Sequence, residues 1–183
     1  EVLKNQLNPH MLFNSLNTLR SLVRENQDKA QDYIQELSRV LRYTLQDNES
    51  QSVTLREELE FASAYIFLLK MRYENNLQFD IQTDKALEEY RVPPMSIQML
   101  IENAVKHNEI SNRKPLTIHI TTNKKEEKLS VSNAIQPKWT ATPGTGIGLV
   151  NLAKRYRLLF KQDIQITEDE EFTVCIPLID EKQ

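Results

Sequence analysis

A histidine on a polar helical stripe is the first residue in this sequence whose surroundings suggest chemistry. His10 is followed at spacings of 4, 3 and 4 by Asn14, Asn17 and Ser21, which would place all four on one face of a helix. The apolar stripe that begins at Leu12 lies about 200° away, so His10 is expected to face solvent. A neutral imidazole has a free lone pair and can act as a nucleophile. The alternative is that a lone surface histidine has no role.

A second polar face is formed by Glu102, Asn103, Lys106 and His107. The last three would share the helix face opposite the apolar stripe that begins at Ile97. A carboxamide oxygen, an ammonium group and an imidazole on one face could hold Mg²⁺ and phosphate groups. The alternative is a solvated helix face on which Glu102 and Lys106 form an ordinary i,i+4 pair.

All the glycines of the sequence stand within five residues, at Gly144, Gly146 and Gly148. Average usage would give about 13 glycines in a chain of this length. Glycines let successive backbone N–H groups turn toward an anion, and a helix after them would add its dipole. The segment is not a Walker loop or a dinucleotide fingerprint, because its spacing and flanking residues differ from both. We expect these glycines to contact a ligand, the alternative being a flexible hinge.

Residues 1–75 lack strand signals and predict three helices packed in a bundle or coiled coil. In each helix, apolar residues recur at spacings of three and four. They are Leu12, Leu16, Leu19 and Val23 in the first, Ala30, Ile34, Leu37 and Leu41 in the second, and Leu55, Leu59, Ala62, Ile66 and Leu69 in the third. Thr54 and Glu57 predict a capping box at the start of the third helix. So much apolar surface favours a homodimer.

Residues 76–183 change from helical to alternating periodicity. They predict a strand around Phe79, a hairpin between 116 and 131, a second hairpin between 164 and 178, and helices after Pro93–Pro94 and after the glycines. Strands in hairpins with helices on one side form an α+β two-layer sandwich. We therefore predict two domains, residues 1–75 and residues 76–183.

The composition narrows the classes of function. The net charge is −3 with acids and bases interspersed, which argues against a nucleic-acid binder. The apolar runs are far shorter than the roughly 20 residues of a membrane span. The single cysteine, Cys175, suits a reducing compartment. Because the sequence begins without methionine and in helical periodicity, we expect it to be part of a longer protein.

Taken together, these segments resemble the LytS-type sensor histidine kinases, whose ATP-binding half belongs to the GHKL superfamily. The resemblance covers essentially the whole chain. It is carried by residues 6–17 (Gln-Leu-Asn-Pro-His-Met-Leu-Phe-Asn-Ser-Leu-Asn), Leu41–Tyr43, Val92–Pro94, Glu102–His107 and Gly144–Asn151. It implies a helical dimerisation and phosphoacceptor region in residues 1–75, followed in residues 76–183 by an ATP-binding catalytic domain of the GHKL (Bergerat) type.

The resemblance implies a two-component kinase core. ATP would phosphorylate His10, and the phosphoryl group would pass to an aspartate of a response regulator, expected to be of the LytTR type. Asn103 would bind Mg²⁺, with Glu102 as a candidate second ligand, and Lys106 and His107 would lie near the phosphates. The chain would be the cytoplasmic portion of a bacterial inner-membrane sensor that is anchored upstream of this segment.

The resemblance also implies further nucleotide contacts. The residues expected to border ATP are Gly144, Thr145, Gly146, Ile147, Gly148, Leu149 and Asn151. They would anchor a mobile lid, roughly residues 136–143, that carries Trp139.

One position departs from the family pattern. The hairpin strand of the family usually ends in an aspartate that accepts a hydrogen bond from the adenine amino group, followed by a turn with glycine. Here Asn133 stands at that position, on the strand face of Leu129 and Val131 that points into the sandwich. Its amide oxygen can accept the bond, which contributes about 1 kcal/mol less than a bond to a carboxylate. We therefore expect weakened ATP binding.

Two other functions stay open at this stage. One is a degenerate nucleotide-binding scaffold, or pseudokinase, that acts through dimerisation and partner binding. The other is a GHKL ATPase without phosphotransfer. The ATPase lacks support because Met99 stands one helical turn before Asn103, where a hydrolytic carboxylate would be expected by analogy.

Overall fold

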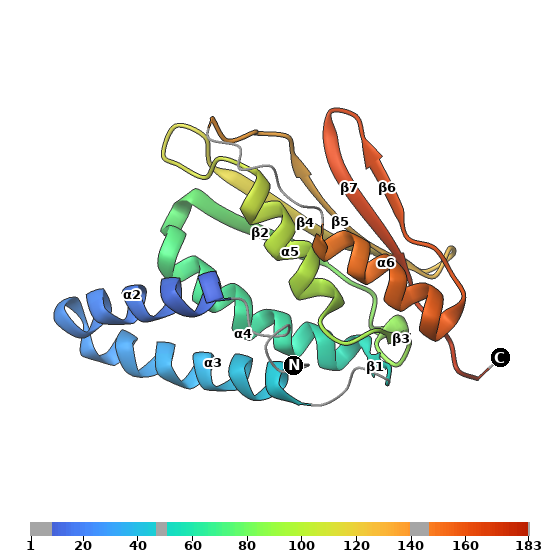
Figure 1. Ribbon diagram of the computed structural model, residues 1–183, viewed down its shortest axis with the longest axis horizontal. Coiled ribbons are helices and arrows are strands. Elements are labelled where there is room, and N and C mark those ends of the chain that lie inside the picture. The colour runs from blue at the N-terminus through green and yellow to red at the C-terminus, as the bar shows by residue number, and fades with distance from the viewer. Residues whose placement is uncertain (1–8, 47–50, 140–146, 183) are drawn as a thin grey trace. The chain divides into compact units, whose positions relative to one another are not determined.

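The structure is a computed structural model that describes residues 9–46, 51–139 and 147–182 (Figure 1). The chain divides into two compact units. The first comprises Glu1–Asp47 and Glu60–Glu74, and the second comprises Asn48–Leu59 and Asn75–Gln183. Within the described residues, no helix combines the length and the apolarity that crossing a membrane requires.

The first unit is helical, as predicted. It contains α2 (Pro9–Glu25), α3 (Gln27–Leu45) and most of α4 (Leu55–Tyr73). Helices α2 and α3 lie side by side as a hairpin (Figure 1). Asn26 forms the turn between them and caps α3, since its side-chain oxygen accepts a hydrogen bond from the Lys29 N–H at 3.1 Å.

Tyr33 fastens α2 to α3. Its side chain is buried, and its hydroxyl makes hydrogen bonds with Ser15 and Thr18. Burial raises the pKa of the Tyr33 phenol above its usual value, and the two hydrogen bonds offset part of that rise. A second contact joins α3 to α4, where the rings of Tyr43 and Phe61 stack with centroids 4.1 Å apart.

The apolar stripe predicted for the first helix is only partly covered among the described residues, with Leu12 and Leu19 half-buried. The face of α2 that is buried against α3 carries Ser15 and Leu22, which neighbour the predicted stripe on the helix surface. Leu16 and Val23 of that stripe are 50% and 52% exposed. The Tyr33 hydroxyl lies against the Ser15 side of α2, and Leu16 and Val23 are left at the surface.

The second unit is built on a mixed sheet with the strand order β2-β4-β5-β7-β6. The strands are β2 (Leu77–Gln82), β4 (Leu116–Asn123), β5 (Lys128–Ala134), β6 (Gln165–Glu168) and β7 (Glu171–Pro177). Strands β2 and β4 pair in parallel, and the other neighbours are antiparallel. Both predicted hairpins, β4–β5 and β6–β7, are confirmed. Short helical turns occur at η1 (Glu74–Asn76) and η2 (Lys85–Leu87).

Helices α5 (Ser96–His107) and α6 (Ile147–Phe160) cover one face of this sheet (Figure 1). The covered face is apolar, with Ile118, Ile120, Leu129 and Val131 all buried. The alternation predicted from the sequence therefore sets the inward face, and the α+β two-layer fold is confirmed. The buried hydroxyl of Tyr156 on α6 donates to the Pro177 carbonyl at 2.9 Å.

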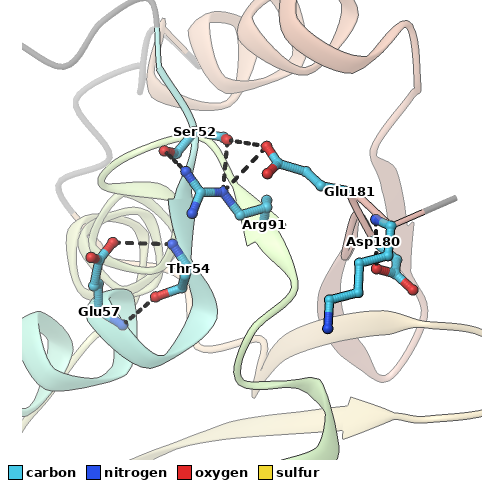
Figure 2. A network of polar contacts seen from close by, with 7 residues as sticks. Ser52, Thr54, Glu57, Arg91, Asp180 and Glu181 are labelled. Atoms are coloured by element: carbon cyan, nitrogen blue, oxygen red, sulfur yellow. Dashed lines mark hydrogen bonds and ion pairs between the residues drawn. The ribbon is translucent and has the colours of Figure 1, made fainter.

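The start of α4 is built into the second unit. Strand β1 (Val53–Thr54) pairs with β3 (Arg91–Val92). The guanidinium of Arg91 donates to the Ser52 carbonyl at 2.6 Å and forms an ion pair with Glu181 at 3.5 Å (Figure 2).

The predicted capping box at the start of α4 is confirmed. The Thr54 N–H donates to the Glu57 carboxylate at 3.1 Å, and the Glu57 N–H donates to the Thr54 hydroxyl at 3.2 Å (Figure 2). These reciprocal bonds satisfy two of the backbone groups that a helix end leaves without an intrahelical partner.

Candidate functional site

His10 lies in the first turn of α2 and is exposed. Pro9 occupies the first helical position, where its missing N–H costs no hydrogen bond. Asn17 and Ser21 are also exposed, and Asn14 is half-buried. The polar stripe therefore faces solvent, as predicted, and presents the imidazole where a large phosphate donor could reach it.

The polar face of α5 also has the predicted orientation. Ile97, Ile101 and Ala104 form its buried side. On the other side, the side chains of Asn103 and His107 are half-buried and Lys106 is exposed. An amide oxygen and an ammonium group therefore stand within one helical turn of each other.

His107 contributes a neutral imidazole to this face. Its pKa lies below the ordinary histidine value, chiefly because burial disfavours the charged form, and also because Lys106 and Lys138 repel a second positive charge. At physiological pH the positive charge on this face comes from the lysines. Neutral His107 can donate one hydrogen bond and accept another.

Glu102 is held by its neighbour one turn earlier on α5. The side-chain amide of Gln98 donates to the Glu102 carboxylate at 3.3 Å. The other polar atom of Gln98, Oε1, is buried without a hydrogen-bond partner among the residues that the structure describes. Because a carboxylate only accepts hydrogen bonds, the amide must turn its NH₂ group toward Glu102 and its oxygen away.

The oxygens of Glu102 and Asn103 fit Mg²⁺ as a partial ligand set. Mg²⁺ prefers hard oxygen ligands and usually takes one or two from protein and the remainder from phosphates and water. Within residues 9–46, 51–139 and 147–182, no cluster of three or more His, Cys, Asp or Glu side chains could hold a metal ion.

Asn133 points into the sandwich, as predicted from strand alternation. It lies on β5 opposite Ile118 of β4 and Phe172 of β7, and only 1% of it is exposed. Its Nδ2 donates to the Ala134 carbonyl at 2.8 Å. With the amide nitrogen engaged, the side-chain oxygen is the atom oriented to accept a bond.

The glycine segment is described only in part. Gly144, Thr145 and Gly146 lie outside the described residues, as do residues 140–143 of the expected lid. Ile147, Gly148, Leu149 and Asn151 form the first turns of α6, with Ile147, Gly148 and Asn151 exposed. Among the residues that the structure describes, a Cβ added at Gly148 would meet no atom within 4 Å, so their packing does not require glycine there.

Asn108, which sequence reasoning did not single out, fastens the end of α5 to the start of the expected lid. Its Nδ2 donates to the Ala104 carbonyl at 2.8 Å, and its Oδ1 accepts from the Gln136 N–H at 2.8 Å. The Glu109 N–H donates to the Gln136 carbonyl at 2.6 Å. Trp139, three residues after Gln136, is 99% exposed. An asparagine just after a helix is a recognisable capping signal, but its second partner is not visible in sequence.

Glu58 is a second residue that sequence reasoning missed. It is a fully buried acid on α4 whose carboxylate accepts hydrogen bonds from the backbone N–H groups of Met95 and Ile97. The available signal was its position, because an acid between Leu55 and Ala62 interrupts an apolar stripe.

Comparison with known proteins identifies the family to which the chain is similar. Residues 1–77 match the family model described as "Histidine kinase". The sensor protein LytS of Staphylococcus epidermidis is 33% identical over 172 residues, which cover 86% of this chain and 29% of that protein. LytS of Streptococcus mutans is 31% identical, covering 92% of this chain and 31% of that protein. The chain thus spans less than a third of the length of these relatives.

Two further comparisons concern a named activity and the fold. A Staphylococcus aureus protein named "Sensor histidine kinase/phosphatase LytS" is 40% identical over 112 residues, which cover 61% of this chain and 19% of that protein. The nucleotide-free catalytic domain of histidine kinase ThkA superposes with a TM-score of 0.50 at 22% identity, covering 73% of this chain and 99% of that domain. At this identity the superposition shows the fold alone. The chain belongs to the LytS-type family of sensor histidine kinases.

Proposed function

We propose that this chain is the kinase core of a two-component sensor: ATP bound by the second unit phosphorylates His10, which then passes the phosphoryl group to an aspartate of a response regulator. The observation that carries the proposal is the exposed histidine on the polar stripe of α2, inside the region that matches the histidine kinase family. Incubation of the chain with labelled ATP tests it, with acid-labile label on His10 as the expected result.

In the proposed reaction, a nitrogen of the His10 ring attacks the γ-phosphorus. A nitrogen–phosphorus bond forms, the bond from the γ-phosphorus to the bridging oxygen breaks, and ADP leaves. Asn103 and Glu102 would supply protein oxygens to Mg²⁺, which neutralises phosphate charge when bound. Lys106 would pair with phosphate oxygens, and neutral His107 would donate a hydrogen bond to them. The ring proton leaves to solvent, since Met11 stands next to His10 where an acidic residue could have served as base.

We further propose that the receiving regulator is of the LytTR type, and that the full protein is a bacterial inner-membrane sensor with this part in the cytoplasm. The LytS relatives are named sensor proteins, which supports the sensor role, whereas the regulator class rests on the family resemblance. Transfer of label from His10 to a panel of purified receiver domains would show which regulator class receives it fastest.

Two exposed apolar side chains on α2, Leu16 and Val23, support a homodimer. We expect the chain to sediment as a dimer and the variant Leu16→Glu/Val23→Glu to sediment as a monomer. Each large apolar side chain buried in such an interface contributes about 1.5–3 kcal/mol, and two charges there would instead lose solvation. Both residues are half-exposed in the isolated chain, so the variant should still fold.

The control for the dimer is Asn17→Glu, an exposed position on the opposite, polar stripe of the same helix. This variant should remain dimeric. Analytical ultracentrifugation of the three proteins decides the matter, and a wild-type monomer at high concentration would contradict the assignment. A fragment that begins at Leu77 should be monomeric, because it lacks the stripe.

Asn133 should set adenine affinity. We expect Asn133→Asp to tighten ATP by about tenfold, since a carboxylate is the stronger acceptor for the amino group. Asn133→Leu should weaken ATP, and GTP should bind poorly to all forms, because guanine presents an acceptor at this position. A buried carboxylate beside the Ala134 carbonyl lacks the donor bond that Asn133 makes, so the Asp variant should be less stable without nucleotide and regain stability when ATP is added.

Calorimetric titration with ATP measures these affinities. Equal affinity across Asp, Asn and Leu at position 133 would show that adenine is recognised elsewhere. If the wild type shows no saturable binding and Asn133→Asp does not restore it, the pseudokinase alternative holds.

Gly148 should separate ligand binding from stability. Because none of the described residues lies within 4 Å of its missing Cβ, Gly148→Ala should raise the free energy of unfolding by up to about 1 kcal/mol through helix propensity. The same methyl group would obstruct a phosphate approaching the backbone, so ATP affinity should fall by about tenfold or more. Lys154→Ala, on an exposed position of the same helix, should leave ATP affinity unchanged. Unaltered affinity in Gly148→Ala would place the ligand away from this turn.

A further inference from the structure

Glu58 caps a helix to which it does not belong. It lies in the first turns of α4, yet its Oε2 accepts from the Met95 N–H at 3.1 Å and its Oε1 from the Ile97 N–H at 3.4 Å. These two N–H groups stand at the N-terminus of α5, where backbone donors lack intrahelical partners. A carboxylate at that end is also favoured by the helix dipole.

Helix α5 has no local substitute for this cap. Met95 stands at the N-cap position and makes no side-chain capping bond. Its φ of 67° lies in the left-handed region, which a residue with a Cβ rarely adopts. The hydroxyl of Ser96 donates to the Pro93 carbonyl at 2.6 Å. This left-handed turn places the start of α5 at Ser96, just after Pro93–Pro94 as predicted.

The capped turn leads directly to the polar face of α5. Gln98 belongs to that first turn and holds the Glu102 carboxylate at 3.3 Å, and Asn103 follows Glu102. Loosening of the first turn would shift Gln98, and with it the carboxylate that Gln98 orients. The carboxylate of Glu58 is therefore connected to the oxygens of Glu102 and Asn103 through the first two turns of α5.

We infer that Glu58 is a positioning residue for the nucleotide site: its carboxylate fixes the first turn of α5 and thereby the oxygens of Glu102 and Asn103 that receive Mg²⁺. The inference rests on the proposed function, since it concerns the same site. It assigns to α4 a part in metal binding that the sequence of α5 does not reveal.

The test compares Glu58→Gln with the wild-type chain. The substitution keeps the shape of the side chain, but it turns an NH₂ group toward one of the two backbone donors and removes the charge. We expect the Mg²⁺ concentration for half-maximal labelling of His10 to rise by about tenfold. ATP affinity measured in EDTA should change by less than about twofold, because it does not depend on the metal oxygens. Glu60→Gln, an exposed acid on the same helix, should match the wild type in both measurements.

The outcomes are distinct. A purely structural Glu58 would lower the melting temperature of Glu58→Gln and leave the Mg²⁺ midpoint of the folded protein unchanged, which overturns the inference while the proposed function stands. A wild-type chain that neither binds ATP saturably nor labels overturns both.

If Glu58→Gln does not fold, the titration is made in a Lys161→Gly background. Lys161 is exposed after the end of α6 with φ of 56°, so glycine there stabilises the fold by relieving strain away from α5. The Mg²⁺ midpoint of Lys161→Gly is then compared with that of the Lys161→Gly/Glu58→Gln double variant. A raised midpoint in the double variant supports the inference, and an unchanged midpoint overturns it.

Discussion

Replacing His10 with glutamine should abolish phosphorylation of the chain by ATP. The sequence contains only three histidines, His10, His107 and His119, so acid-labile label can be assigned by substitution alone. His10 is exposed at the start of α2, and loss of its ring removes the nucleophile itself, for which an amide cannot substitute. The label should fall to background, while ATP affinity and the melting temperature stay close to those of the wild type.

His119→Gln is the matched control. His119 lies on β4 and its Nδ1 is 3.2 Å from the Asp80 carboxylate on β2, so the ring already has a surface partner unrelated to phosphate. This variant should label at the wild-type rate. Label that persists on His107 or His119 in the His10→Gln chain would refute the assignment of the phosphoacceptor.

The sequence predicted the helices, hairpins and helix cap that depend on the spacing of residues close together in the chain. Spacings of three and four residues predicted the helices, alternation predicted the two hairpins and the inward face of Asn133, and Thr54 with Glu57 predicted the capping box. Each of these depends on residues within a few positions of one another. The polar stripe of His10 belongs to the same class, because helix geometry alone fixes which side it shares.

Features that join distant segments were not predicted. The partners of Glu58 on α5 are 37 and 39 positions away, and Asn108 meets Gln136 at a separation of 28. The parallel pairing of β2 with β4 is of the same kind. Helical periodicity also could not decide which apolar face of α2 meets α3, since Leu22 and Val23 are adjacent apolar positions and only Leu22 is buried.

The sequence predicted which residue types stand at the proposed nucleotide site, but not their protonation state. Lys106 and His107 were both candidates for phosphate contacts, but the sequence does not show whether the imidazole carries a charge. The structure makes His107 half-buried beside two lysines, which lowers its pKa and keeps it neutral. The lowered pKa of His107 depends on its burial and on the nearby Lys138, which follows β5 in the sequence. Neither can be read from the sequence around His107.

Among substitutions in the second unit, those at Asn103 should change the rate of His10 labelling most. Asn103→Ala removes a proposed metal oxygen from the half-buried face of α5. Metal ions stabilise phosphoryl-transfer transition states by several kcal/mol, so loss of one ligand should slow labelling of His10 by about 100-fold or more. The backbone of α5 should be unaffected, because alanine is the better helix former.

Two companion variants separate metal from phosphate contacts. Asn103→Asp keeps an oxygen ligand and should retain labelling within about tenfold of the wild type. Lys106→Met should raise the ATP concentration for half-maximal labelling without moving the Mg²⁺ midpoint, because the lysine pairs with phosphate and not with the metal. The rate of His10 labelling, measured across ATP and Mg²⁺ concentrations, distinguishes the three variants. If Asn103→Ala and Lys106→Met shift the same parameter by the same amount, Asn103 contacts phosphate or water, and the metal must take its protein oxygens from Glu102 or from another element.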